Sequence, residues 1–173
     1  GTPDCGVAMW AGSCRKVTVI DLTIAGNVFD DANGMNNTFV DGPGTNAANA
    51  IYMNLVDASD KVVSSLLVAS GGTYSFGTAS GVLDNTGYTL ILTTTSQTPG
   101  NTLTAATYPA NWVSTGEQLG TGAGNDGTPN GKLSVDTNSG SVAQANFGVD
   151  QLPNSTNASG SFVNPGGTNT ITV

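Results

Sequence analysis

The chain has 173 residues, of which 9% are charged, and 12 acidic side chains against 4 basic ones give it a net charge of −8. This balance argues against nucleic acids and anionic membrane surfaces, which both require basic patches, and it favours cations as small partners. The sequence has no histidine and a single glutamate, Glu117, so Ser–His–Asp and Cys–His catalytic arrangements are excluded and the protein is predicted not to be an enzyme.

Residues 1–16 form a predicted N-terminal extension that contains both cysteines. Cys5 and Cys14 lie nine positions apart, and a disulfide between them would close a small loop ahead of the first strand. The alternative is two free thiols in a reducing compartment, but the remaining composition favours the disulfide and an extracellular location. Trp10 lies inside this loop and is expected to pack against the disulfide or against a neighbouring subunit.

Short apolar runs rich in Val, Ile, Thr and Tyr, separated by Gly and Asn turns, fill residues 17–151. Such runs are typical of pleated strands, and no window keeps a helical period over three turns. They predict an all-β, antiparallel, Ig-like sandwich with long Gly-rich loops. Strands are expected over residues 16–27, 50–57, 61–69, 73–76, 88–94, 102–108, 132–136, 141–150 and 169–173. Residues 58–61 and 138–140 have the composition of hairpin turns.

Acidic and amide side chains are concentrated in residues 28–42, VFDDANGMNNTFVDG. Calcium prefers six to eight oxygen ligands, which loops of this kind supply. The adjacent carboxylates have no lysine nearby, so they repel one another and a cation would relieve the repulsion. We therefore expect a Ca²⁺ site, with a solvated polar turn as the alternative. The expected ligands are Asp30, Asp31, Asn33, Asn36 and Asp41.

Residues 114–131 are Gly-rich and almost free of apolar side chains, which predicts a surface loop. Within it, Glu117 and Asp126 are candidates for a second cation site, whereas a flexible loop is a poor frame for a catalytic pair. Trp112 and Tyr108 are candidates for stacking on a sugar ring. For Trp112, the apolar surroundings favour the alternative, in which it packs against the core.

Residues 152–173 are predicted to be a linker that ends in a short strand, NTITV. This strand could return to its own sheet, begin a following domain or add to the sheet of a neighbouring subunit. In the last case the contact residues would be Asn169, Thr170, Ile171, Thr172 and Val173.

The order of several motifs resembles a known family. IAGNVFDDANG is followed by IYMNLVDASDKVV, GGTYSF and GYTLIL, over about residues 23–95. This order resembles the B-type repeat of Ser-Asp-repeat surface adhesins, a calcium-binding relative of the Cna-B sandwich, in the form found in repetitive secreted Bacteroidota-type surface proteins. The resemblance implies a Cna-B-like sandwich in which Asp31 and Asn33 take the first two calcium positions. It places Asp41 near the last position and requires Asn36 to replace the aspartate that the family has where Met35 stands.

The residues and the resemblance together predict a non-enzymatic structural repeat or subunit of an extracellular cell-surface filament or adhesin. Calcium would stiffen it, and it would polymerise with neighbouring copies or adjacent repeats by strand addition. The alternative is a carbohydrate- or ligand-binding module of a secreted multidomain protein, with a host or glycan ligand. No apolar run approaches the ~20 residues that a membrane span needs.

Overall fold

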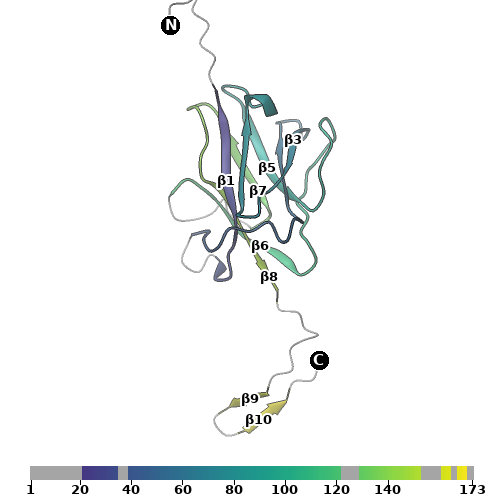
Figure 1. Cartoon of the computed structure of the whole chain (residues 1–173), viewed down its shortest axis with the longest axis vertical. Helices are drawn as coiled ribbons and strands as arrows, with labels where there is room; N and C mark the ends of the chain where they lie inside the picture. Colours follow the sequence, from purple (N-terminus) through teal and green to yellow (C-terminus); the bar gives the residue numbers. More distant parts are fainter. Residues whose placement is uncertain (1–20, 35–38, 122–128, 153–160, 165–166, 171–173) are drawn as a thin grey trace, which may run out of the picture.

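The computed structural model describes residues 21–34, 39–121, 129–152, 161–164 and 167–170. For the last two ranges it describes the backbone alone. Cys5, Cys14, Trp10, Asn36, Asp126, Ile171, Thr172 and Val173 lie outside the described residues. Within them the protein is an all-β sandwich (Figure 1), which confirms the expected fold class.

Ten strands and one short 3₁₀ helix make up the regular structure of the described residues. In chain order they are β1 (Thr23–Asp30), β2 (Tyr52–Val56), β3 (Val62–Leu67), β4 (Thr73–Gly77), η2 (Thr78–Ser80), β5 (Gly87–Thr93), β6 (Trp112–Leu119), β7 (Lys132–Asp136), β8 (Ala145–Gln151), β9 (Ser161–Asn164) and β10 (Gly167–Thr170).

Eight of these strands form the two layers of the sandwich. The first sheet has the order β4-β1-β8-β6 and the second has the order β3-β2-β5-β7. The expected strands at 50–57, 61–69, 73–76, 88–94 and 132–136 are confirmed as β2, β3, β4, β5 and β7. The turn at 58–61 joins β2 to β3 as a hairpin, with Asp57 N donating to Lys61 O over 2.9 Å.

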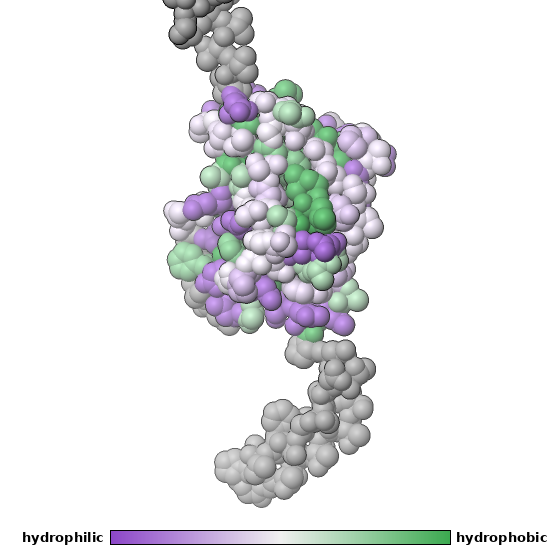
Figure 2. Space-filling model, viewed as in Figure 1, coloured by the Kyte–Doolittle hydropathy of each residue, from purple (hydrophilic) through white to green (hydrophobic). Residues whose placement is uncertain are grey.

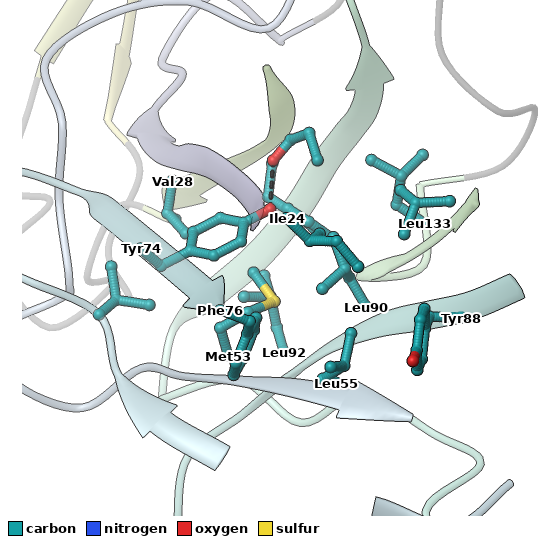
Figure 3. Packing of buried hydrophobic residues seen from close by; sticks show 14 of the residues in the cluster. Ile24, Val28, Met53, Leu55, Tyr74, Phe76, Tyr88, Leu90, Leu92 and Leu133 are labelled. Carbon is teal, nitrogen blue, oxygen red and sulfur yellow. Dashed lines mark hydrogen bonds between the residues drawn. The ribbon is translucent and has the colours of Figure 1, made fainter. Parts of the chain in front are cut away.

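The core lies between the two sheets and follows from the alternation of apolar residues in each strand. Ile24 and Val28 of β1 are fully buried, as are Phe76 of β4 and Phe147 of β8 on the same sheet. The opposite sheet supplies Met53, Leu55, Leu90, Leu92 and Leu133 to the same cluster. Figure 3 shows the labelled members of this cluster, among them Ile24, Phe76 and Leu90, converging from both layers.

The segment between β5 and β6 is not the strand expected at 102–108. It makes one isolated bridge, between Thr102 and Lys61, and runs over the outer face of the second sheet. Leu103 and Ala106 pack there against Val62 and Ile91 in a second, smaller cluster. The Thr- and Ala-rich pattern resembled a strand. Beyond its backbone hydrogen bonds near the start of β3, however, the segment continues over the sheet, and its apolar side chains cover the outer face.

Strand β6 occupies the first part of the loop expected at 114–131. Its sequence, WVSTGEQL, has polar residues at the positions that the sheet buries. Glu117 and Gln118 are buried and both accept hydrogen bonds from backbone amides. The polar composition of residues 114–119 therefore wrongly predicted an exposed loop, because buried polar groups are tolerated when they are hydrogen-bonded.

The first and last strands of the sandwich lie side by side and run parallel. Val28, Phe29 and Asp30 of β1 pair with Phe147, Gly148 and Val149 of β8. The turn at 138–140 is not the expected hairpin turn, because it leads from β7 in the second sheet to β8 in the first. As a result, the chain enters β1 at one end of the sandwich and leaves β8 at the opposite end (Figure 1).

A separate antiparallel hairpin follows, formed by β9 and β10. Ser161 pairs with Thr170 at its open end, and Asn164 pairs with Gly167 next to the turn. The strand expected at 169–173 thus begins two residues earlier, and the region expected to be a linker contains β9. Among the described residues, no helix is both long and apolar enough to cross a membrane.

Candidate functional site

The acidic loop folds back over the outer face of β8 and β6. Strand β1 ends at Asp30. The alternation of buried and partly exposed side chains along it continues to Val28, which is buried in the core. Asp31 N then donates to Val149 O of β8 over 2.8 Å. Further along the loop, Val40 N donates to the side-chain oxygen Oε1 of Gln118 in β6 over 2.9 Å. These contacts fix both ends of the described loop to the sheet.

Glycine at position 148 makes room for the Asp31 side chain. Phe147 and Val149 on either side are fully buried in the core, so position 148 faces outward by strand alternation. A Cβ there would collide with the Thr115 hydroxyl and would stand 2.8 Å from Asp31 Oδ2. Any larger residue would therefore displace Asp31 from its place over β8.

Asp31 is a carboxyl almost completely removed from solvent, with 1% of its surface exposed. Its Oδ2 accepts a hydrogen bond from the Thr115 hydroxyl over 2.8 Å. Its Oδ1 is buried and has no hydrogen-bond partner among the described residues. A buried carboxylate oxygen without a partner is costly.

Burial raises the pKa of the Asp31 carboxyl, and the nearby carboxylates of Asp41, Asp150 and Asp30 raise it further, while the Thr115 hydrogen bond opposes them. Asp41 reaches this neighbourhood through a hydrogen bond from Asn33 Nδ2 to its Oδ1 over 3.3 Å. The structure thus gathers four of the five expected ligands in one region.

Two members of this region were not anticipated from the sequence: Thr115 in β6 and Asp150 in β8. Both are distant in the chain from the acidic loop, and only the pairing of β8 with β1 and β6 brings them to it. Asp150 follows an ordinary strand pattern, so no local signal distinguished it. Among the described residues, no three Asp, Glu, Cys or His side chains are grouped as a metal site.

Glu117 has a different environment from the surface loop that was expected. It is fully buried, and its Oε1 accepts hydrogen bonds from Ser114 Oγ over 2.8 Å and from Asn130 N over 3.1 Å. Gly131 N also donates to it. Because Gly131 directly precedes β7, Glu117 connects β6 to the start of β7.

Trp112 and Tyr108 are both partly buried and pack against the main core. Burial raises the pKa of Tyr108 to about 12, and the nearby carboxylate of Glu117 adds to the increase. This packing favours the core role for both residues, and sugar stacking remains a prediction.

Comparison of this chain with protein-family models found no match, and comparison with curated proteins found none either. The resemblance to calcium-binding adhesin repeats therefore stays an expectation.

Proposed function

We propose that this chain is a non-enzymatic structural unit of an extracellular filament or adhesin at the cell surface. The observation that supports this proposal best is the parallel pairing of β1 with β8. A domain whose first and last strands are parallel neighbours passes the chain from one end of the sandwich to the other. Units of this kind can be joined end to end in a line, and tension then runs along the strands.

The surface agrees with a scaffold role. Figure 2 shows a face that is largely neutral or hydrophilic, with a limited apolar patch near its middle. Only 9% of all residues are charged and histidine is absent. Such a surface offers hydrogen-bonding groups but few side chains for acid–base catalysis.

Joining of units is proposed to occur by addition of the terminal strand at 169–173 to a sheet of a neighbouring copy. The described part of this segment, Asn169 and Thr170, is already extended in β10. An isolated two-stranded hairpin is marginally stable in water, so β9 and β10 would gain stability from a third strand. The partner proposed here is a second copy of the chain or an adjacent repeat.

Deletion of residues 169–173 tests this mode of joining. The full chain should form linear assemblies in electron micrographs and sediment as species larger than a monomer, whereas the deleted chain should remain monomeric. Asp84→Asn, at an exposed position in the turn before β5, serves as the control and should still assemble. Assemblies of unchanged length from the 169–173 deletion would contradict strand addition.

Ca²⁺ is proposed as the ligand of the acidic loop. The partnerless Asp31 Oδ1 and the surrounding carboxylates and amides are hard oxygen donors, the type that calcium prefers. A bound ion would link the end of β1 to the loop that covers β6 and β8. The resulting stiffness is the proposed contribution of calcium to the filament.

A further inference from the structure

The pairing of β1 with β8 is preceded by an irregularity, which lies between the isolated bridge of Ile24 with Val142 and the first pair of the ladder, Val28 with Phe147. From the bridge between Ile24 and Val142 to the pair of Val28 with Phe147, β1 advances by four residues, whereas the segment that leads into β8 advances by five. The additional residue makes a bulge, and Gln144 within it has a left-handed backbone with φ 56°. Bulges leave backbone groups that the strand ladder does not pair.

Two side chains satisfy the backbone at this bulge. Tyr74, on β4, donates its hydroxyl hydrogen to Ala145 O on β8, as the dashed line in Figure 3 shows. Asn146 presents its Oδ1 to Asn27 N of β1 over 3.1 Å. A buried carbonyl without a partner is costly, so the Tyr74 hydroxyl replaces a hydrogen bond that the ladder lacks.

The Tyr74 side chain crosses β1 to reach β8. Strand β1 lies between β4 and β8 in the sheet, and the crossing takes place at Gly26. A Cβ at Gly26 would collide with the Ala145 carbonyl and would stand 2.8 Å from the Tyr74 hydroxyl. The Tyr74 ring is held by Phe76 and Phe147, with ring centroids 6.3 and 6.4 Å away.

We propose that Tyr74 is a mechanical latch that joins β4 to β8 across β1 and resists extension of the domain. Tension between the two ends of the sandwich pulls β1 toward its start and β8 toward its end. Because these strands are parallel neighbours, the tension shears their hydrogen bonds all at once instead of opening them one by one. The bulge lies directly before the three residue pairs of this ladder, and the latch bonds β8 there, at Ala145 O.

The purpose of the latch rests on the proposed function, but its mechanical effect does not. Single full-length chains are held by terminal handles and unfolded at constant force. Tyr74→Phe removes only the hydroxyl, and the rate of unfolding under force should rise roughly tenfold, since forced unfolding follows the unfolding rate.

Tyr88→Phe is the matched control. Tyr88 is also about 5% exposed, and its hydroxyl bonds Leu83 N and Gly81 O in the turn before β5, away from the sheared pair. This variant should unfold under force within about twofold of the wild-type rate, although both variants lower the melting temperature.

Equal acceleration by the two variants, or none by Tyr74→Phe, would overturn the proposal. Asn146→Ala removes the second side chain from the bulge at a partly exposed position and should also accelerate forced unfolding, so it tests the latch if Tyr74→Phe fails to fold. Loss of assembly in the terminal deletion and loss of the latch are measured separately, so either idea can fail alone.

Discussion

At the scale of single residues, Asp31 is the group whose environment departs furthest from that of an ordinary aspartate. Its neighbours in the chain, Asp30 and Asn33, are at least partly exposed, whereas Asp31 is buried against Gly148 on the outer face of β8. The cause is the outward-facing glycine in β8, which leaves space for one buried carboxyl. Burial and neighbouring carboxylates favour its neutral form, which raises its pKa.

This raised pKa predicts how stability depends on pH when no cation is present. Between the ordinary pKa near 4 and the raised native pKa, the folded state binds more protons than the unfolded state. The free energy of unfolding should therefore fall as pH rises through that window. Asp31→Asn should remove this part of the pH dependence and make the protein more stable than wild type above the window. Urea unfolding in chelator at a series of pH values measures both effects.

Asp84→Asn is the control for that experiment, because Asp84 is exposed in the turn before β5. It should keep the wild-type slope of stability against pH. A wild-type slope in Asp31→Asn as well would contradict the assignment to Asp31.

At the scale of elements, the junction of β6 with β7 depends on one buried carboxylate. Strands β6 and β7 belong to different sheets, so Glu117 links the two layers through the amides of Asn130 and Gly131. Hydrogen bonds to a charged acceptor are stronger than neutral ones. Within the described part of the chain, no strand ladder connects the two layers here. The hydrogen bonds that the Glu117 side chain accepts therefore hold the junction together.

Glu117→Gln should lower the free energy of unfolding by about 2–3 kcal/mol, since one acceptor oxygen becomes an amide donor that faces backbone donors. Hydrogen exchange of the Gly131 amide should accelerate with it. Asp60→Asn, in the exposed turn between β2 and β3, should change the free energy of unfolding by less than about 0.5 kcal/mol. Unchanged exchange at Gly131 would show that Glu117 does not hold this junction.

At the scale of the whole molecule, the acidic loop and the parallel strand pair meet at the end of the sandwich where β8 leaves it. The Asp31 amide bonds β8 at Val149, next to the last described residues of the domain. In the proposed filament, a cation held there would join the loop to β8, which would carry the tension. Calcium binding and mechanical resistance would then reinforce each other.

Calcium should accordingly raise the melting temperature. Free calcium at about 100 times its dissociation constant adds about 2.7 kcal/mol to stability, which corresponds to a shift of roughly 5–10 °C for a domain of this size. Differential scanning calorimetry with calcium and with chelator measures the shift. Asp31→Asn should abolish most of it, whereas Asp84→Asn should retain it. An identical wild-type melting curve in both conditions, with no calcium by elemental analysis, would remove the ion from the proposal.

The sequence by itself determined the strand content and most strand positions. In β2, β4, β5 and β7, apolar residues recur at every second position or in short runs. Burial of this apolar surface favours a strand whichever distant segment becomes its partner. It also determined the acidic loop, because Asp30, Asp31, Asn33 and Asp41 lie close together in the chain.

Only the tertiary structure decided which sheet each strand joins, and the site and the latch depend on that choice. Strand β6 was missed because its buried positions are polar residues whose hydrogen-bond partners come from distant segments. Thr115 and Asp150 reach Asp31, and Tyr74 reaches Ala145, because β8 lies between β1 and β6. Local patterns encode burial and turns, whereas contacts between residues 71 to 119 positions apart arise from packing.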